Sequence, residues 1–340
     1  MKLKILGFTL LAASLCSVCS ICCSDSKTPD YEFPEGPDPA PQQGDYPPGL
    51  TVTEFTDNLP GGKQCLGFVA VADLKANPKL RFNAVYLPRQ KTPSRIHAEF
   101  ASANRGTAYV TTNAGYWWSR KSLSLLVSGS VVESIENQTV ERNNQTVYPV
   151  RSSFGQMASG EFETRWVYCV LDDGNKPYAF PSALNNDERT NTYMSAPPTS
   201  KTPGAEFWTP QEAVGGGPML VKEGKNVAVE NYWKEVFDGG GVAGTSRQPR
   251  TAIGATADGK LILLVCDGRN MRHSAGFTLA ELADKLIALG AVEAINLDGG
   301  GSSTMVGSNG KVLNRPSDTG SAEVIIERKI PTAVVISEVN

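Results

Sequence analysis

The chain has 340 residues, a hydrophobic content of 40% and a formal net charge of −3. This length and composition are typical of a folded protein with a large core, and no run of basic residues after the N-terminus marks a nucleic-acid interface. We therefore expect no nucleic-acid partner.

The N-terminal residues 1–23 resemble an export signal of the lipoprotein type. They combine two early lysines, an apolar stretch and small residues, and are too short for a stable membrane span. Cys22 and Cys23 stand directly before Ser24 and Asp25, as in a bacterial lipoprotein cleavage region. We expect lipidation at Cys23 rather than Cys22, and hence an exported cell-envelope lipoprotein on the periplasmic or surface face. An ordinary cleaved signal is the alternative.

Residues 24–49 are rich in proline, glycine and acidic side chains, which predicts an extended tether between membrane and folded domain. The folded domain is then 50–340. Its three cysteines, Cys65, Cys169 and Cys266, lie among apolar residues and match no metal-ligand spacing. We expect them to be buried free thiols.

The first half of the domain has the pattern of a β-rich fold. Glycine, proline and asparagine separate segments with strand patterns, and one helix is predicted from Pro93 to Ala103. The polar residues 172–210 show no periodicity and predict a long loop, a lid or a wall of a cleft. The predicted strands are 50–55, 66–74, 80–87, 107–118, 122–134 and 160–171.

The C-terminal part begins with a hairpin over 250–269 that turns at Asp258-Gly259. A helix follows, with Thr278 and Glu281 as its capping box and Gly290 at its end. Residues 291–297 predict a strand that ends at Asp298. The order of elements predicts an α+β fold: a mixed, largely antiparallel β-sheet core with a few packed helices, in a single catalytic domain.

Two acidic residues at strand ends are candidate catalytic groups. Asp267 and Asp298 each end an apolar run and precede glycine, where a ligand can approach the backbone closely. If their strands are neighbours, the two carboxylates share a cleft, and a pair of carboxylates in different environments is the usual equipment for glycosidic cleavage. A simple turn is the alternative for either acid, but Gly299–Gly301, Ser302 and Ser303 exceed what a turn needs.

An anionic substrate would find several donors here. Backbone N–H groups of Gly299–Gly301 could hold phosphate, although no GxxxxGK[ST] motif is present. Arg250 and Arg269 could each bind phosphate through two donors, with structural ion pairs as the alternative. The glycine stretch from Asp238 formally contains GxGxxG, and we assign it to a flexible loop.

The aromatic stretch after the strand at 107–113 is a candidate sugar site. The Asn113 amide could bind hydroxyls while Tyr116 and Trp117 stack on a sugar face, and we place Trp118 in the core. His273 could be a proton donor or ligand, or an exposed loop residue. His97 is expected at the surface or boundary of its helix.

Five stretches together resemble the phosphodiester glycosidase family. They are "TTNAGYW" (111–117), "AVGGGPMLV" (213–221), "RTAIGATADGKLILLVCDGR" (250–269), the run from Gly276 to Val306 that contains "NLDGGGSS", and "RPSDTGSAEVIIE" (315–327). The resemblance implies hydrolysis of a sugar-1-phosphodiester at the glycosidic side, releasing free sugar and a phosphomonoester. At the positions that match the family's motifs, the resemblance implies that the following are pocket residues: Asn113, Arg250, Asp267, Arg269, Asn296, Asp298, Gly299, Gly300 and Ser302.

Further residues of the same stretches complete the candidate substrate site: Tyr116, Thr251, His273, Gly216, Gly217, Gly301 and Ser303. Asp298 is expected to be the principal catalytic carboxylate, with Asp267 as its partner or an orienting group. Envelope or host glycan phosphodiesters are the expected substrates. No cofactor and no metal ligand set are expected, a bound divalent cation is left open, and no oligomeric state is predicted.

Two other functions remain as alternatives. The first is a non-catalytic surface lipoprotein that binds glycan through the same pocket. The second is a metal-dependent phosphodiesterase that cleaves the other P–O bond.

Overall fold

The computed structural model describes residues 45–103, 106–318 and 325–339. All of these residues belong to one compact unit. The predicted signal with Cys22 and Cys23, and the tether up to residue 44, therefore lie outside the described residues. Within the described ranges, no helix has the length and apolar character needed to cross a bilayer.

A seven-stranded sheet carries both predicted carboxylates at the ends of its strands. Its order is β1-β2-β19-β18-β20-β16-β17. β18 and β19 form the predicted hairpin, and Gly259 in its turn has a φ of +86°, which L side chains rarely adopt. The strands are β1 (Leu50–Leu59), β2 (Lys63–Ala72), β16 (Met219–Lys222), β17 (Lys225–Asn226), β18 (Arg250–Thr256), β19 (Leu261–Cys266) and β20 (Ala291–Asn296).

Two further sheets complete the β structure. The four-stranded sheet has the order β21-β4-β22-β3, with β3 (Leu80–Lys91), β4 (Thr107–Asn113), β21 (Met305–Val306) and β22 (Ile330–Glu338). The second seven-stranded sheet has the order β14-β13-β12-β11-β15-β7-β8. Its strands are β7 (Leu126–Ser128), β8 (Val131–Ser134), β11 (Arg151–Gln156), β12 (Phe162–Val170), β13 (Lys176–Phe180), β14 (Glu206–Phe207) and β15 (Glu212–Gly215).

Small hairpins join β5 (Trp117–Trp118) to β6 (Lys121–Ser122), and β9 (Val140–Arg142) to β10 (Gln145–Val147). All the ladders between these named strands are antiparallel. The predicted, largely antiparallel β core is therefore confirmed, whereas the parallel strand pairs that a mixed sheet would contain are not found among them. The α+β class describes the arrangement in outline.

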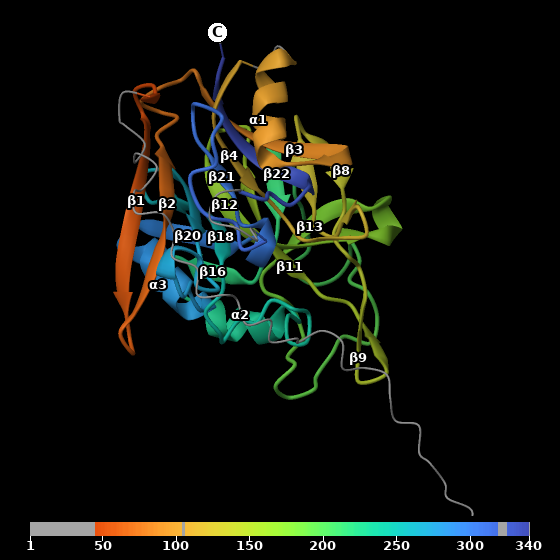
Figure 1. Ribbon diagram of the computed structural model, residues 1–340. Helices are drawn as coiled ribbons and strands as arrows, with labels where there is room; N and C mark the ends of the chain where they lie inside the picture. The colour runs from red at the N-terminus through yellow and green to blue at the C-terminus, as the bar shows by residue number, and fades with distance from the viewer. Residues whose placement is uncertain (1–44, 104–105, 319–324, 340) are drawn as a thin grey trace, which may run out of the picture. The chain divides into compact units, whose positions relative to one another are not determined.

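Three α-helices lie in the described part of the chain: α1 (Pro93–Ser102), α2 (Ala228–Lys234) and α3 (Leu279–Ala288). α3 has the predicted capping box, in which Thr278 accepts from the Glu281 N–H and the Glu281 side chain accepts from the Thr278 N–H. α1 packs on β4 and β22, whereas α2 and α3 pack on β16 (Figure 1). α2 was not predicted from the sequence, because a helix of seven residues is too short to show a clear repeat of apolar positions.

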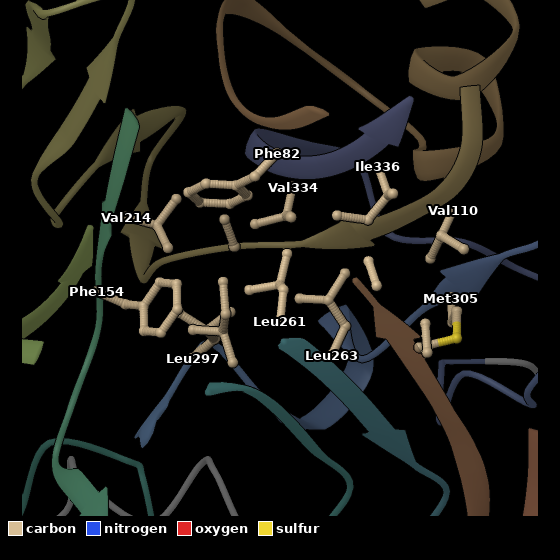
Figure 2. Packing of buried hydrophobic residues seen from close by; sticks show 14 of the residues in the cluster. Phe82, Val110, Phe154, Val214, Leu261, Leu263, Leu297, Met305, Val334 and Ile336 are labelled. Atoms are coloured by element: carbon tan, nitrogen blue, oxygen red, sulfur yellow. The ribbon is translucent and has the colours of Figure 1, made fainter. Parts of the chain in front are cut away.

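The main hydrophobic core lies between the sheets. In Figure 2 the side chains of Phe82, Val334 and Ile336 from the four-stranded sheet face those of Leu261 and Leu263 from β19. The opposite face of β19, with Ile262 and Leu264, packs with residues of α3 in a second cluster. β19 is therefore buried on both faces, which explains its continuous apolar sequence and fixes the position of Asp267 at its end.

Two boundaries differ from the sequence predictions. Tyr46, within the segment assigned to the tether, is buried in the main core, so the folded unit begins before Leu50. The prediction of a loop throughout 172–210 is wrong in part, because β13 pairs with β12 and β14 inside that segment. β13 has only five residues and contains Pro177, which removes a ladder donor and hides the strand pattern.

Candidate active site

Asp267 and Asp298 lie on the same side of the first seven-stranded sheet, at the C-terminal ends of two of its strands. Asp267 follows β19 and Asp298 follows β20, and both strands run antiparallel to β18. The two strands are not neighbours, because β18 lies between them, so the condition for a shared cleft is not met. Adjacent strands are about 4.8 Å apart, so two strand spacings separate the two backbones by roughly 10 Å.

Pro249 fills the space between the two acidic turns. A Cβ on Gly268 would lie 2.5 Å from the Pro249 nitrogen, and a Cβ on Gly299 would lie 2.8 Å from the Pro249 carbonyl oxygen. The Gly300 N–H also donates to that oxygen at 3.0 Å. The glycines after each acid are therefore required by close packing on both sides of Pro249, in addition to any contact with a ligand.

Asp298 is half-buried and its backbone is tightly held. Its N–H donates to the Ala114 carbonyl at 3.0 Å, and its own carbonyl accepts from Asn113 Nδ2 at 2.6 Å. Burial raises the pKa of the Asp298 carboxyl to about 6, while the nearby Ser302 hydroxyl and Arg328 guanidinium oppose this rise. A carboxyl with such a pKa exchanges protons readily near neutral pH, as acid–base catalysis requires.

Asn113 joins three segments of the site. Its Nδ2 reaches Asp298, and its Oδ1 accepts from Thr251 Oγ1 at 2.8 Å and from the Thr304 N–H at 3.2 Å. Both Asn113 and Thr251 are buried. These two predicted substrate residues are thus placed beside Asp298, where they hold the turn that carries it.

Asp267 is fully buried, with 0% of its surface exposed. Its Oδ1 accepts from Asn314 Nδ2 at 3.1 Å and from the Arg315 N–H at 2.7 Å, and Arg272 Nη1 lies 3.7 Å from Oδ2. Burial raises the pKa of the Asp267 carboxyl to about 7. This geometry suits the orienting role predicted for Asp267 better than contact with a substrate.

Asn314, which the sequence did not single out, organises the segment after Asp298. Besides Asp267, its Nδ2 donates to the Ser303 carbonyl at 2.9 Å, and its Oδ1 accepts from the Met305 N–H at 2.9 Å. Ser302 and Ser303 are themselves fully buried. Their predicted role as phosphate donors stays a prediction and would need this segment to move.

Tyr116 and Asn296 meet at a single backbone carbonyl. Asn296 Nδ2 donates to the Tyr116 hydroxyl at 2.7 Å, and both side chains donate to the Gly217 carbonyl, at 3.1 and 2.7 Å. Burial and the Asp298 carboxylate raise the pKa of the Tyr116 hydroxyl, so it remains a neutral donor. The Tyr116 ring packs against Phe237, with ring centroids 5.5 Å apart.

Gly216 and Gly217 contact other parts of the protein closely. A Cβ on Gly216 would lie 2.3 Å from the Asn296 carbonyl oxygen, and a Cβ on Gly217 would lie 2.5 Å from Glu235 Oε2. Glu235 was not predicted. Its buried carboxylate accepts hydrogen bonds from Ser152, Trp166 and Met219, and burial raises its pKa to about 7.

The two predicted arginines occupy different environments. Arg250 is buried, and its guanidinium donates to four backbone carbonyls at 2.8–3.0 Å, those of Val242, Ala243, Ser246 and Phe277. It therefore anchors the glycine loop from Asp238 to the sheet. Its role as a phosphate ligand stays a prediction, and few of its donors remain for one.

Arg269 is exposed and lies against the glycine turn. A Cβ on Gly300 would be 3.2 Å from Arg269 Nη2. Arg269 donates to Gln248 Oε1 at 3.1 Å and to Ser317 Oγ at 3.3 Å, both of them uncharged groups. Its charge remains uncompensated by these partners, as a phosphate ligand requires.

A second guanidinium, which the sequence did not single out, reaches the same turn. A Cβ on Gly301 would lie 2.4 Å from Arg328 Nη2 and 2.0 Å from Asp318 Oδ1, and these two residues form an ion pair at 2.8 Å. Arg269 and Arg328 thus approach adjacent glycines of the turn that follows Asp298. Of the turn's own N–H groups, that of Gly300 is already bonded to Pro249, so the predicted backbone cradle is only partly open.

Three other predictions can be compared with the structure. Trp118 is 75% exposed, so its placement in the core is wrong; the alternation along the short strand β5 turns it outward. His97 is buried against Thr111, with Nδ1 and Oγ1 3.0 Å apart, so its surface placement is also wrong. The free, buried state of Cys65, Cys169 and Cys266 is confirmed. Among the described residues, no group of three or more His, Cys, Asp or Glu side chains forms a metal cluster.

A surface cavity of about 770 Å³ adjoins the site on the side of Arg269. His273 lies in its wall with Arg269 and Gln248, and Gln248 directly precedes Pro249. The predicted substrate residue His273 is thus brought near the glycine turn through this cavity. Asp298 and Asn296 do not line it.

A sequence model of the phosphodiester glycosidase family matches residues 170–337, which include Asp267, Asp298 and Arg328. This part of the chain belongs to the phosphodiester glycosidase family. This assignment confirms the family resemblance carried by the residues around Arg250 and Asp298.

Individual relatives match shorter parts. An uncharacterised prophage-derived protein of Bacillus subtilis is 37% identical over 122 residues, 36% of this chain and 16% of its own length. N-acetylglucosamine-1-phosphodiester alpha-N-acetylglucosaminidase is 40% identical over 90 residues in Bos taurus (26% of this chain) and 46% over 69 residues in Homo sapiens (20% of this chain). The matched regions span only 16% and 13% of those two enzymes' own lengths.

Solved structures share the fold of this phosphodiester glycosidase family member. The catalytic domain of the zebrafish N-acetylglucosamine-1-phosphodiester alpha-N-acetylglucosaminidase, auto-inhibited by its pro-peptide, superposes with a TM-score of 0.56 at 19% identity, covering 88% of this chain and 87% of that one. A hypothetical protein from Synechocystis superposes with a TM-score of 0.51 at 19% identity, covering 85% of this chain and 62% of that one.

Proposed function

We propose that this chain hydrolyses the glycosidic bond of a sugar-1-phosphodiester, of the N-acetylglucosamine-1-phosphodiester type, and releases free sugar and a phosphomonoester. The observation that carries the proposal is the surroundings of Asp298. A half-buried carboxyl with a pKa of about 6 stands at the start of a glycine turn that two guanidinium groups approach. Family membership and the names of the mammalian relatives support the same chemistry.

Asp298 supplies the carboxylate that acts at the anomeric carbon, either as nucleophile or as the base for water. The bond that breaks joins C1 to the phosphate oxygen, and its electron pair leaves with the phosphate. A phosphate is a good leaving group, so its departure needs charge stabilisation more than protonation. Arg269 provides that charge beside Gly300, whereas the Arg328 guanidinium beside Gly301 is paired with the Asp318 carboxylate.

One carboxylate is sufficient in this scheme. Asp267 lies two strand spacings away and is fully buried, so we assign it to positioning. Through Asn314 it holds the segment Ser303–Met305, which follows the glycine turn. Tyr116 lies close enough to Asp298 for its pKa to be raised by that carboxylate, and Tyr116 and the Asn296 bonded to it would border the sugar.

The setting of the enzyme is also a proposal. The N-terminal sequence supports export and lipidation at Cys23, with the folded unit tethered to a bacterial envelope membrane on its periplasmic or surface face. Envelope or host glycan phosphodiesters are the substrates available to such a protein. No metal or other cofactor is required by the proposed chemistry.

Product identity tests the proposal against its alternatives. Incubation with the methyl diester of N-acetylglucosamine-1-phosphate should give free N-acetylglucosamine and methyl phosphate. Release of N-acetylglucosamine-1-phosphate, abolished by a chelator, would instead indicate a metal-dependent phosphodiesterase. Binding of the diester without any product would indicate a glycan-binding protein.

A further inference from the structure

The cavity beside Arg269 is built from three segments that meet next to the glycine turn. Its walls come from the β1–β2 hairpin around Lys63, from Gln248 directly before Pro249, and from residues Arg269 to Ala275 after β19. Gln248 and Arg269 are bonded to each other at 3.1 Å, and both line the cavity. Arg269 therefore faces both the cavity and Gly300, two residues beyond Asp298.

The lining of this cavity is positively charged. Lys63, Arg247 and Arg269 line it, and no aspartate or glutamate of the described residues does. Arg247 is neutralised by Glu281, with Nη2 and Oε1 2.7 Å apart. Among the described residues Arg269 bonds only to uncharged side chains, and Lys63 has no carboxylate partner. Two uncompensated cations thus line the cavity, Arg269 at the glycine turn and Lys63 on the hairpin.

The other polar groups of the lining are amides that donate and accept hydrogen bonds. Asn58, Gln64, Gln248 and Asn270 supply four such side chains, whereas Leu59 and Ala275 supply the apolar ones. Amides in this number suit hydroxyl groups. At about 770 Å³ the cavity is larger than a single phosphate needs and lies within the usual size of a small-molecule site.

We propose that this cavity binds the aglycone of the diester, and that the aglycone is a hydroxylated group carrying a second anionic charge, such as a polyol phosphate or a sugar phosphate. The inference rests on the proposed function, because it takes the scissile phosphate to lie at Arg269 and Asp298. The sugar then lies toward Tyr116, and the chain beyond the phosphate extends along the hairpin to Lys63. Lys63 is a specificity-determining residue in this arrangement.

A matched pair of substrates tests the inference. One is the diester of N-acetylglucosamine-1-phosphate with glycerol, and the other is the same diester with glycerol 3-phosphate, which adds one anionic group. Lys63→Ala should lower kcat/KM for the second substrate about 3- to 10-fold and leave the first unchanged, because only the second contacts Lys63. The effect should shrink in about 0.5 M salt.

Lys79→Ala is the matched control, since Lys79 is also exposed but lies outside the cavity. It should leave both substrates unchanged. Equal effects of Lys63→Ala on the two diesters, or no effect on either, would overturn the inference while the proposed function stands. If the wild type cleaves neither diester, the proposed function fails instead.

A binding measurement tests the proposed role of the cavity independently of catalysis. Calorimetric titration with glycerol 3-phosphate should show binding that Lys63→Glu weakens at least about 5-fold and Lys79→Glu does not. No binding by the wild type, or equal affinities in the two variants, would show that the cavity does not hold an anionic polyol.

Discussion

The Asn314 amide donates to the fully buried Asp267 carboxylate, with Nδ2 and Oδ1 3.1 Å apart. This pair connects the strand end at β19 with the segment that follows Asp298, because the same amide also donates to the Ser303 carbonyl. The position of the segment after the glycine turn therefore depends on a carboxylate that is buried from solvent.

Asp267→Asn should retain most of the activity, within about 10-fold of wild type, because its amide oxygen can still accept from Asn314 and from the Arg315 N–H. Asp267→Ala leaves these donors unsatisfied and should lower the free energy of unfolding by about 1–3 kcal/mol. Denaturant unfolding and kcat/KM of both variants provide the measurement. Complete loss of activity in a fully stable Asp267→Asn protein would show that Asp267 takes part in the chemistry.

Asp298 should make the stability depend on pH. Its folded pKa of about 6 lies above the ordinary value, so the folded state binds the proton more tightly than the unfolded state. The resulting stabilisation is complete below the unfolded pKa of about 4 and is lost as the pH rises toward 6. Relative to wild type, Asp298→Asn should gain about 1–2 kcal/mol between pH 4 and pH 8, after allowance for partial exposure.

The measurement is the difference in unfolding free energy between the two proteins across that pH range. Asp258→Asn, at the exposed hairpin turn, serves as the control and should show no such gain. A constant difference for Asp298→Asn from pH 4 to 8 would contradict a raised pKa at this position.

The glycine turn should tolerate no side chain at Gly299. Gly299→Ala places a Cβ 2.8 Å from the Pro249 carbonyl oxygen and should lower the free energy of unfolding by about 1–3 kcal/mol. Gly310→Ala is a useful comparison, because its φ of +74° imposes backbone strain while nothing lies near the new Cβ. Thermal unfolding compares the two. A Gly299→Ala protein as stable as wild type would show that Pro249 can move aside.

Substitution of Arg250 should mainly lower stability, and substitution of Arg269 should mainly lower activity. Arg250→Lys loses most of four carbonyl contacts in a buried position and should lower the free energy of unfolding by about 2–4 kcal/mol. Arg269→Lys should leave stability within about 0.5 kcal/mol and lower kcat/KM at least about 10-fold. The reverse pattern would exchange the roles assigned here to Arg250 and Arg269.

Local sequence signals predicted the elements on which the site is built. The capping box at Thr278 and Glu281 located α3, and the Asp258-Gly259 turn located the β18–β19 hairpin, since both depend on residues close in sequence. The position of Asp298 at a strand end followed from the apolar run before it. What sequence could not show was that β18 separates the two acidic turns, because strand order depends on contacts between distant segments.

The environments of individual polar residues could not be predicted from the sequence either. Arg328 and Asp318 are ten positions apart in segments without periodicity, and only the tertiary fold brings them to Gly301. Glu235 follows a helix of seven residues and has the sequence context of a surface acid, yet it is fully buried. Arg250 was expected at a phosphate, whereas its position on the α3-facing side of β18 directs it to backbone carbonyls.

Hydrolysis in ¹⁸O-labelled water tests the central claim, which is cleavage of the C1–O bond with Asp298 as the acting carboxylate. The wild type should place the label in the free sugar and none in the phosphomonoester, and Asp298→Asn should reduce the rate at least about 100-fold while Asp258→Asn does not. Label in the phosphate, or an unchanged rate in Asp298→Asn, would contradict the account.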